Sequence, residues 1–233
     1  ESIRMQADAI FQKALPKVPD IKSPRATAFA MLGLFYYSQA HGRPRVKNLL
    51  ARLADSQVQR FSEASSKDWL WFEDSFTYSN SKLPESLFYA YLATGNTAYL
   101  EVAEQSLQFL LRLTFEKEYF SPIGQNGWYI KDGKRAYFDQ QPEDTSSMVQ
   151  TLLVAYQATK KEMYRKRALE AFQWFLGKNH LRQMVYDETT GGCHDGVGQN
   201  TLNLNQGAEA TISYLLARLA LEDFRSNHFS NNV

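Results

Sequence analysis

Acidic residues gather in three segments of the sequence, each lying shortly before a run with the apolar spacing of a helix. Cleavage of a glycosidic bond needs two carboxyl groups: one protonates the leaving oxygen, and the other activates water or attacks the sugar carbon. Acids that converge from separate loops can supply such a pair. The candidate catalytic residues are Glu73, Asp74, Asp139 and Asp195.

Aromatic and hydrogen-bonding residues accompany these acids, which is a composition typical of carbohydrate sites. An exposed aromatic ring can stack on the apolar face of a sugar, and amide, carboxylate and imidazole groups can bond its hydroxyls. We therefore expect an oligosaccharide or glycoconjugate as the substrate. The candidate substrate-binding residues are Trp71, Tyr78, Asn80, Trp128, Glu143, Asp144, His194, Asn205, Gln206 and Glu209.

Several of these residues also have a structural interpretation, which stays open at this point. Asp and Glu before a helix often cap it or complement the helix dipole. This explanation applies to Glu85, to Asp144 and to Glu209, which lies near the start of a helical run. His194 and Asp195 could likewise form a pair that orders their loop.

Other chemistries find little support in the sequence. Cys193, His194 and Asp195 are of metal-ligand types, but residues adjacent in sequence rarely point at one ion, and no spaced partner pair accompanies them. The same geometry argues against Cys193 as a nucleophile. Phosphate loops, dinucleotide fingerprints and Gly-x-Ser-x-Gly elbows are absent from the sequence. We expect neither a metal nor a cofactor.

The length, charge and cysteine content of the chain limit which class of protein it can be. The 233 residues suffice for one sizeable core, and we expect a single domain over residues 1–233. The formal net charge of +1 argues against nucleic-acid binding, and no apolar run approaches the roughly 20 residues of a membrane span. A single cysteine favours the cytoplasm. Because the sequence begins at Glu1 without an initiator methionine, upstream helices can be missing from it.

Helical periodicity accounts for most of the chain. The stretch 115–139 is different, because its spaced glycines and an alternating pattern at 128–130 predict a two-stranded excursion or an ordered loop. The predicted helices span about 2–15, 26–40, 45–61, 83–93, 97–113, 145–158, 162–176 and 206–224.

A repeat links two of the predicted helix pairs. Residues 87–94 align with 152–159, and at the same offset Tyr99 aligns with Tyr164 and Asp74 with Asp139. Repeated helical hairpins that each follow a substantial loop are typical of an α/α toroid or solenoid. Because the loops before the inner helices of such a ring gather at one end, we expect the three acidic loops to meet at one cleft.

Four motifs follow one another along the chain: WFEDSFTYSNSKLP at 71–84, QPED at 141–144, YDETTGGCHDG at 186–196 and NQGAEAT at 205–211. Together they resemble a bacterial family of α/α-toroid domains, which look like six-hairpin glycosidases and occur fused to, or encoded beside, retaining glycosyltransferases of the GT-B type. The family usually has Asp where this chain has Ser79, so we expect one polar contact of the site to be missing. A complete toroid has more hairpins than this sequence predicts, so we expect either an incomplete ring or further helices upstream of Glu1.

The sequence therefore predicts an all-α, toroid-like fold and a carbohydrate-active function, with hydrolysis of glycosidic bonds as the leading reaction. Two alternatives stay open. One is a non-catalytic glycan-binding or scaffolding partner of a glycosyltransferase. The other is a sugar epimerase on a similar toroid, which would need a pair of histidines, whereas His41, His180 and His228 lie in helix-end or tail contexts.

Overall fold

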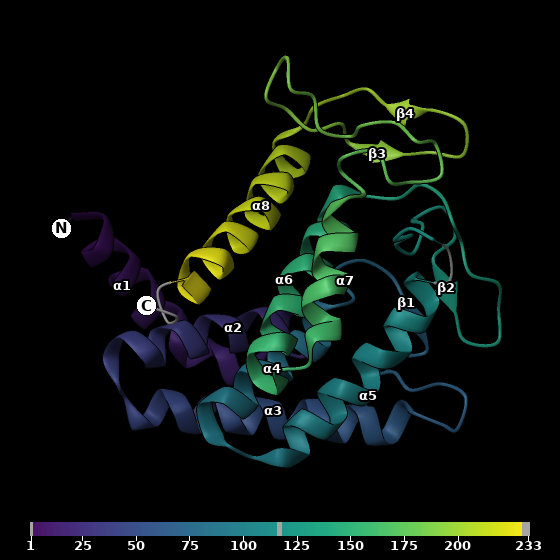
Figure 1. Ribbon diagram of the computed structural model, residues 1–233. Coiled ribbons are helices and arrows are strands. Elements are labelled where there is room, and N and C mark those ends of the chain that lie inside the picture. The colour runs from purple at the N-terminus through teal and green to yellow at the C-terminus, as the bar shows by residue number, and fades with distance from the viewer. Residues whose placement is uncertain (1, 116–117, 230–233) are drawn as a thin grey trace.

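The computed structural model describes residues 2–115 and 118–229, and most of them lie in helices (Figure 1). The expectation of an all-α fold is met. A short 3-10 helix at Leu15–Asp20 follows the first α-helix. The α-helices are α1 (Ser2–Ala14), α2 (Pro24–His41), α3 (Pro44–Ala64), α4 (Lys82–Thr94), α5 (Thr97–Thr114), α6 (Pro142–Thr159), α7 (Glu162–Phe172) and α8 (Ala208–Phe229).

Local sequence sets where several helices begin and end. Ser23 caps α2, since its side chain accepts a hydrogen bond from the N–H of Ala26, and Pro24 occupies the first turn. Gly42 and Gly95 end α2 and α4 in the left-handed conformation, which glycine adopts without a Cβ clash. These stops produce the tight turns that fold the helices into hairpins.

The helices form two layers. α2, α4, α6 and α8 pack against one another in succession as an inner row, while α3, α5 and α7 each pack on the inner helix that precedes them. The core lies where these helices meet, and Leu87 and Phe88 on α4 and Leu152 on α6 are fully buried there. Burial of these apolar side chains supplies the main stabilisation of the fold.

The two hairpins that the repeat predicts are both present. α4 ends at Thr94 and α6 at Thr159, positions that the repeat aligns, and α5 and α7 begin at the aligned residues Thr97 and Glu162. They differ at their loop ends, because α6 starts earlier than expected and α7 stops at Phe172. Turns over 173–177 replace the predicted last helical turn where the chain enters the loop layer.

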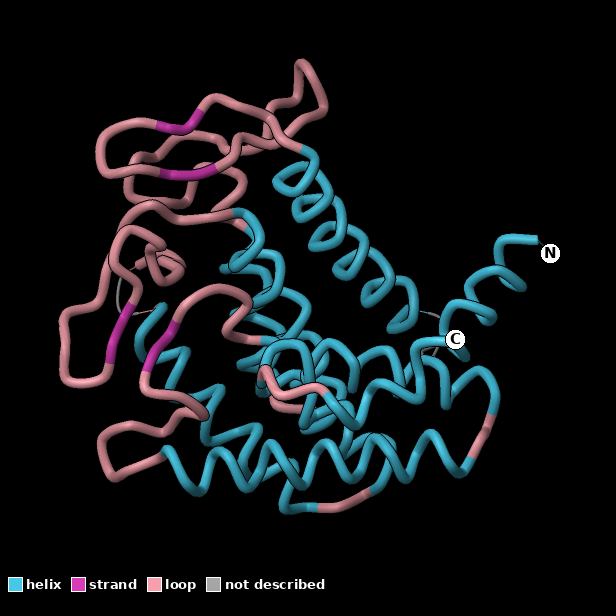
Figure 2. Tube along the Cα trace, turned by 180° about the vertical axis from the view of Figure 1, so that it is seen from behind, coloured by secondary structure: helices cyan, strands magenta, loops and turns pink. Residues whose placement is uncertain are grey.

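Long loops and two small antiparallel sheets lie together on one side of the molecule (Figure 2). β1 (Ser75–Phe76) pairs with β2 (Tyr129–Ile130), and β3 (Gly196–Val197) pairs with β4 (Leu202–Asn203). The stretch 118–139 thus contributes one strand to a sheet with the loop before α4, rather than a two-stranded unit of its own. The loops that precede α4, α6 and α8 meet in this layer.

α8 ends the inner row with one apolar face uncovered. Tyr214 and Ala217 are buried, whereas Ile212, Leu216 and Leu219 are each at least half exposed. A groove of about 510 Å³ runs along this face and is lined on its other sides by residues of α6, with Tyr36 of α2 and Tyr89 of α4. The described helices therefore form an open arc rather than a closed ring (Figure 1). None of the helices in the described residues is long and apolar enough to cross a membrane.

Candidate active site

Asp139 and Asp195, two of the four predicted catalytic acids, line the same open pocket. Its volume is about 170 Å³, and its wall is mainly polar. It lies in the loop layer, where Gln141 precedes the first residue of α6. The other lining residues are Gln125, Gly196, Gly198, Thr201, Leu202 and Asn203.

Backbone hydrogen bonds join three loops around this pocket. Gln140 and Val197 form an isolated antiparallel bridge, in which the N–H of each donates to the carbonyl of the other over 2.9 Å. The N–H of Gln125 donates to the carbonyl of Asp139 over 3.0 Å. The position of Asp139 relative to Asp195 is therefore set by main-chain contacts.

Glycines allow these backbones to approach so closely. A Cβ atom on Gly196 would lie 2.9 Å from the carbonyl oxygen of Gln140, and one on Gly198 would lie 3.2 Å from Oδ1 of Asp139. A side chain at Gly196 would force the bridged strands apart. Gly196 and Gly198 are thus required by the geometry of the pocket wall.

Asp195 both lines the pocket and caps α8. The N–H of Gly207 donates to Oδ1 of Asp195 over 2.7 Å, directly before the first residue of the helix. The N–H of Asp195 donates to the carbonyl of the predicted residue Asn205 over 2.8 Å. Asp195 thus caps α8 instead of pairing with His194, the alternative that the sequence had left open, and its Oδ2 atom accepts no hydrogen bond from the described part of the chain.

Three of the other polar side chains in the pocket wall are of particular interest, because they make no hydrogen bond with the described part of the protein. They are the carboxylate of Asp139 and the carboxamides of Gln125 and Gln141. Together they offer acceptors and donors to a ligand, without the need to break a contact within the protein.

Two histidines support the pocket loops without lining the pocket. Nε2 of His180 lies 2.9 Å from the carbonyl oxygen of Gly198, and its ring packs on Phe138. Nδ1 of the predicted residue His194 lies 3.2 Å from the carbonyl oxygen of Leu204. Across residues 2–115 and 118–229, no group of three or more His, Cys, Asp or Glu residues could hold a metal ion.

Gln206 organises the turn that precedes Asp195 in the chain. Its amide donates to Oδ2 of Asp187 over 2.9 Å and accepts from the hydroxyl of Thr190 over 2.8 Å. The N–H of Thr189 and the amide of Gln206 lower the pKa of Asp187. Glu209, in the first turn of α8, is exposed to solvent.

A second polar group surrounds Arg25 in the first turn of α2. Arg25 is 7% exposed, pairs with Glu73, and donates to the carbonyl of Tyr78 over 2.6 Å and to Oδ1 of Asn80 over 3.1 Å. Its guanidinium also lies over the ring of Tyr78, which is 55% exposed. Glu73 is thus held by a buried cation and does not line the pocket of Asp139.

Three predicted substrate-binding residues are buried within the protein, which corrects the expectation for them. Trp71 is fully buried and stacks on Phe76 with 4.2 Å between ring centroids, so neither face of its ring is open to a sugar. Asn80 is 4% exposed and bonds Arg25 and the backbone of Thr77. Both residues hold the loop before α4 in place.

Asp144 is the third buried residue, at 8% exposed in the first turn of α6. Burial raises its pKa well above the usual Asp range, and the neighbouring Glu143 raises it further, against the N–H donors of Ser79 and Asn80. Its carboxyl lines a cavity of about 10 Å³ with Ser81, which is room for about one water molecule. Asp144 therefore faces the interior.

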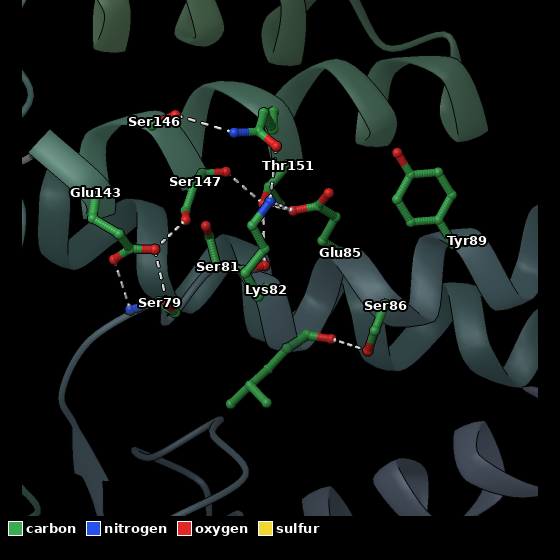
Figure 3. A network of polar contacts seen from close by, with 12 residues as sticks. Ser79, Ser81, Lys82, Glu85, Ser86, Tyr89, Glu143, Ser146, Ser147 and Thr151 are labelled. Carbon is green, nitrogen blue, oxygen red and sulfur yellow. Dashed lines mark hydrogen bonds and ion pairs between the residues drawn. The ribbon is translucent and has the colours of Figure 1, made fainter. Parts of the chain in front are cut away.

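Glu143 faces the loop before α4 (Figure 3). Its carboxylate accepts from the hydroxyl of Ser79 over 2.7 Å and from the hydroxyl of Ser147 over 2.8 Å. An ionised Asp at position 79 could not donate this bond. The departure from the resembled family at Ser79 therefore creates a contact with Glu143.

Asp74 and Trp128 remain near the surface. The side chain of Asp74 is 80% exposed and lies 3.9 Å from Nζ of Lys131. Trp128 is partly buried and has a φ of 55°. Neither lines the pocket of Asp139, and their predicted roles, like that of Glu73, stay predictions.

The residues of these two groups that had not been predicted include Arg25, Gln125, Gln141 and Asn203. Arg25 follows Pro24 in a helix start, where an Arg is usually a solvated charge. Gln141 carried a usable signal, because it stands between the acidic loop and Pro142, at the N-cap position of α6.

Solved structures share this arrangement of helices. An α-mannanase of glycoside hydrolase family 76 from Bacteroides thetaiotaomicron aligns with a TM-score of 0.60 at 15% identity, over 86% of this chain and 52% of that chain. A D-mannose isomerase aligns with a TM-score of 0.63 at 14% identity, over 85% and 56%. A sugar epimerase from a ruminal bacterium aligns with a TM-score of 0.62 at 14% identity, over 88% and 57%.

No protein-family model and no curated protein matches the sequence. The chain spans little more than half the length of the three structures described above, which agrees with the open arc of its helices. At these identities the likeness shows the fold alone. The chain has the α/α-toroid fold that glycosidases and sugar epimerases share, over part of the ring.

Proposed function

We propose that this protein acts on carbohydrates and cleaves glycosidic bonds, with Asp139 and Asp195 as its pair of carboxyl groups. The observation that carries the proposal is that these two acids, far apart in sequence, line one open polar pocket in the loop layer of a toroid. The fold supports it, because a structure with the same fold is a mannanase.

The contacts of the two acids suggest their roles. Asp195 accepts the N–H of Gly207 at Oδ1, a bond that holds its carboxyl group in place and leaves Oδ2 to act as a base or nucleophile. Asp139, which makes no hydrogen bond with the described part of the protein, would take up a proton once the substrate is bound and pass it to the leaving oxygen. Gln125, Gln141 and Asn203 surround the acids and would hold sugar hydroxyls.

Isomerisation or epimerisation of a sugar is the second candidate. Two observations favour it. A D-mannose isomerase has a similar fold, and His180 contacts the Gly198 carbonyl at the edge of the pocket. Such a reaction moves a proton on a sugar carbon, so product formed in deuterated water would carry deuterium. Hydrolysis of a glycosidic bond leaves no deuterium on carbon.

A non-catalytic glycan-binding partner of a glycosyltransferase is the third candidate, implied by the motif resemblance and favoured by the capping role of Asp195. We keep the glycosyltransferase as a proposed partner and the cytoplasm as the proposed location. Co-purification with glycosyltransferases of the source cell and cell fractionation test these two points.

A glycan array and an oligosaccharide-hydrolysis screen on one preparation separate the candidates. Release of new reducing ends supports hydrolysis. Saturable binding without any turnover supports the binding module, and conversion of free sugars with solvent deuterium uptake supports the isomerase. A preparation that neither binds nor converts any sugar would reject a carbohydrate function.

A further inference from the structure

We infer that the pocket of Asp139 and Asp195 takes a single uncharged sugar unit and rejects sugars that carry a phosphate or carboxylate group. This inference rests on the proposed function only in that the pocket binds a sugar. It follows from the charges, the hydrogen-bonding groups and the size of the pocket wall.

Both ionisable side chains that line the pocket are acidic. Asp139 and Asp195 supply two carboxylates, and none of the described lining residues is Lys, Arg or His. An anionic group on the sugar would enter beside these charges without a cation to neutralise it. Repulsion from one carboxylate at several ångströms, partly screened by water, weakens binding by roughly tenfold.

The helix N-termini beside the pocket do not offset this charge. A helix N-terminus can bind an anion through its free N–H groups. At α8, however, the N–H of Gly207 already bonds Asp195, and at α6 the first turn carries Glu143 and Asp144. The positive ends of both helices therefore face carboxyl groups of the protein itself.

The uncharged groups of the wall match the hydroxyls of a sugar ring. The carboxamides of Gln125 and Gln141 can each donate and accept, and neither is used within the described part of the protein. The volume of about 170 Å³ is smaller than the roughly 300–1,000 Å³ of pockets for drug-sized ligands. The space within the pocket walls therefore suits one ring.

The test compares dissociation constants of matched probes by calorimetry or ligand-observed NMR. The probes are neutral methyl hexosides of several configurations, the corresponding hexose 6-phosphates and the corresponding hexuronic acids. They are titrated into the unchanged protein and into Asp139→Asn, Asp195→Asn and Asp68→Asn. Asp68 is an exposed acid that does not line the pocket, so its variant controls for the loss of one charge.

We expect at least one neutral probe to bind roughly tenfold or more tightly than its anionic counterparts. Asp139→Asn and Asp195→Asn should narrow this ratio severalfold, while Asp68→Asn should leave it unchanged. Added salt should narrow it in the unchanged protein, because salt screens the repulsion. An anionic probe that binds as tightly as its neutral counterpart overturns the inference but leaves the proposed function. Failure of every neutral probe to bind also overturns the inference, and the oligosaccharide-hydrolysis screen then decides the proposed function separately.

Discussion

Nζ of Lys82 lies 2.7 Å from Oε2 of Glu85, and both side chains are almost completely buried where α4 meets α6 (Figure 3). Two side chains of α6 complete the network, because Oε1 of Gln150 accepts from Lys82 over 3.1 Å and the hydroxyl of Thr151 lies 2.9 Å from Glu85. The pair thus fixes one inner helix against the next.

Replacement of Lys82 alone should therefore be strongly destabilising. Lys82→Met leaves the Glu85 carboxylate buried without a cation, which should lower the free energy of unfolding by about 3–5 kcal/mol. The double variant Lys82→Met, Glu85→Leu removes both charges and should recover most of this loss. Urea unfolding followed by circular dichroism measures both values. Equal stability of the two variants would show that the charges are not coupled.

The close backbone approach at Gly196 can be tested by comparing alanine substitutions at Gly196 and at Gly33, a glycine outside the pocket. Gly196→Ala places a Cβ atom 2.9 Å from the carbonyl oxygen of Gln140, and we expect a loss of about 1–3 kcal/mol together with reduced sugar binding. Gly33→Ala, in the interior of α2, meets no atom within 4 Å and should stabilise the protein by about 0.5–1 kcal/mol. Tolerance of alanine at Gly196 would mean that the bridged loops are not closely apposed.

Asp144 should make the folded state less stable as the pH rises. Because its pKa is raised in the folded state, the folded protein holds this proton more tightly than the unfolded chain does. Its contribution is therefore most favourable at low pH and is lost as the pH rises from about 4, the ordinary Asp value, through the raised value. Asp144→Asn should remove this loss and flatten the profile. Thermal melts of both proteins from pH 4 to 8 test it, and identical profiles would contradict it.

The helices could be predicted because their signals are local. Apolar spacing, Pro24 at a helix start and Gly95 at a helix end each act within a few residues, and the repeat carried the hairpin pattern from α4 and α5 to α6 and α7. The early start of α6 was missed, since the Gln140–Val197 bridge that fixes the preceding loop joins segments far apart in sequence.

The site could be predicted only in part, for a similar reason. The acids before inner helices predicted that three loops would meet at one cleft, but only Asp139 and Asp195 line one pocket, whereas Glu73 and Asp74 do not. The role of Trp71 could not be assigned from sequence, because an aromatic residue beside acids can bind a sugar or belong to the core. In the structure Trp71 packs against Phe76 and is part of the core. Arg25 was missed because its contacts with Glu73 and Asn80 are tertiary.

The most direct test of the central claim is the hydrolysis rate of Asp139→Asn and Asp195→Asn on the best oligosaccharide of the screen. Each amide keeps the shape of the acid, and the amide oxygen that Asp195→Asn introduces can still accept the N–H of Gly207, so melting temperatures should change little. Each substitution should lower kcat/KM by about 10²–10⁴-fold, while Asp68→Asn should retain the full rate. Full activity in both pocket variants would contradict the assignment of Asp139 and Asp195 as the catalytic pair.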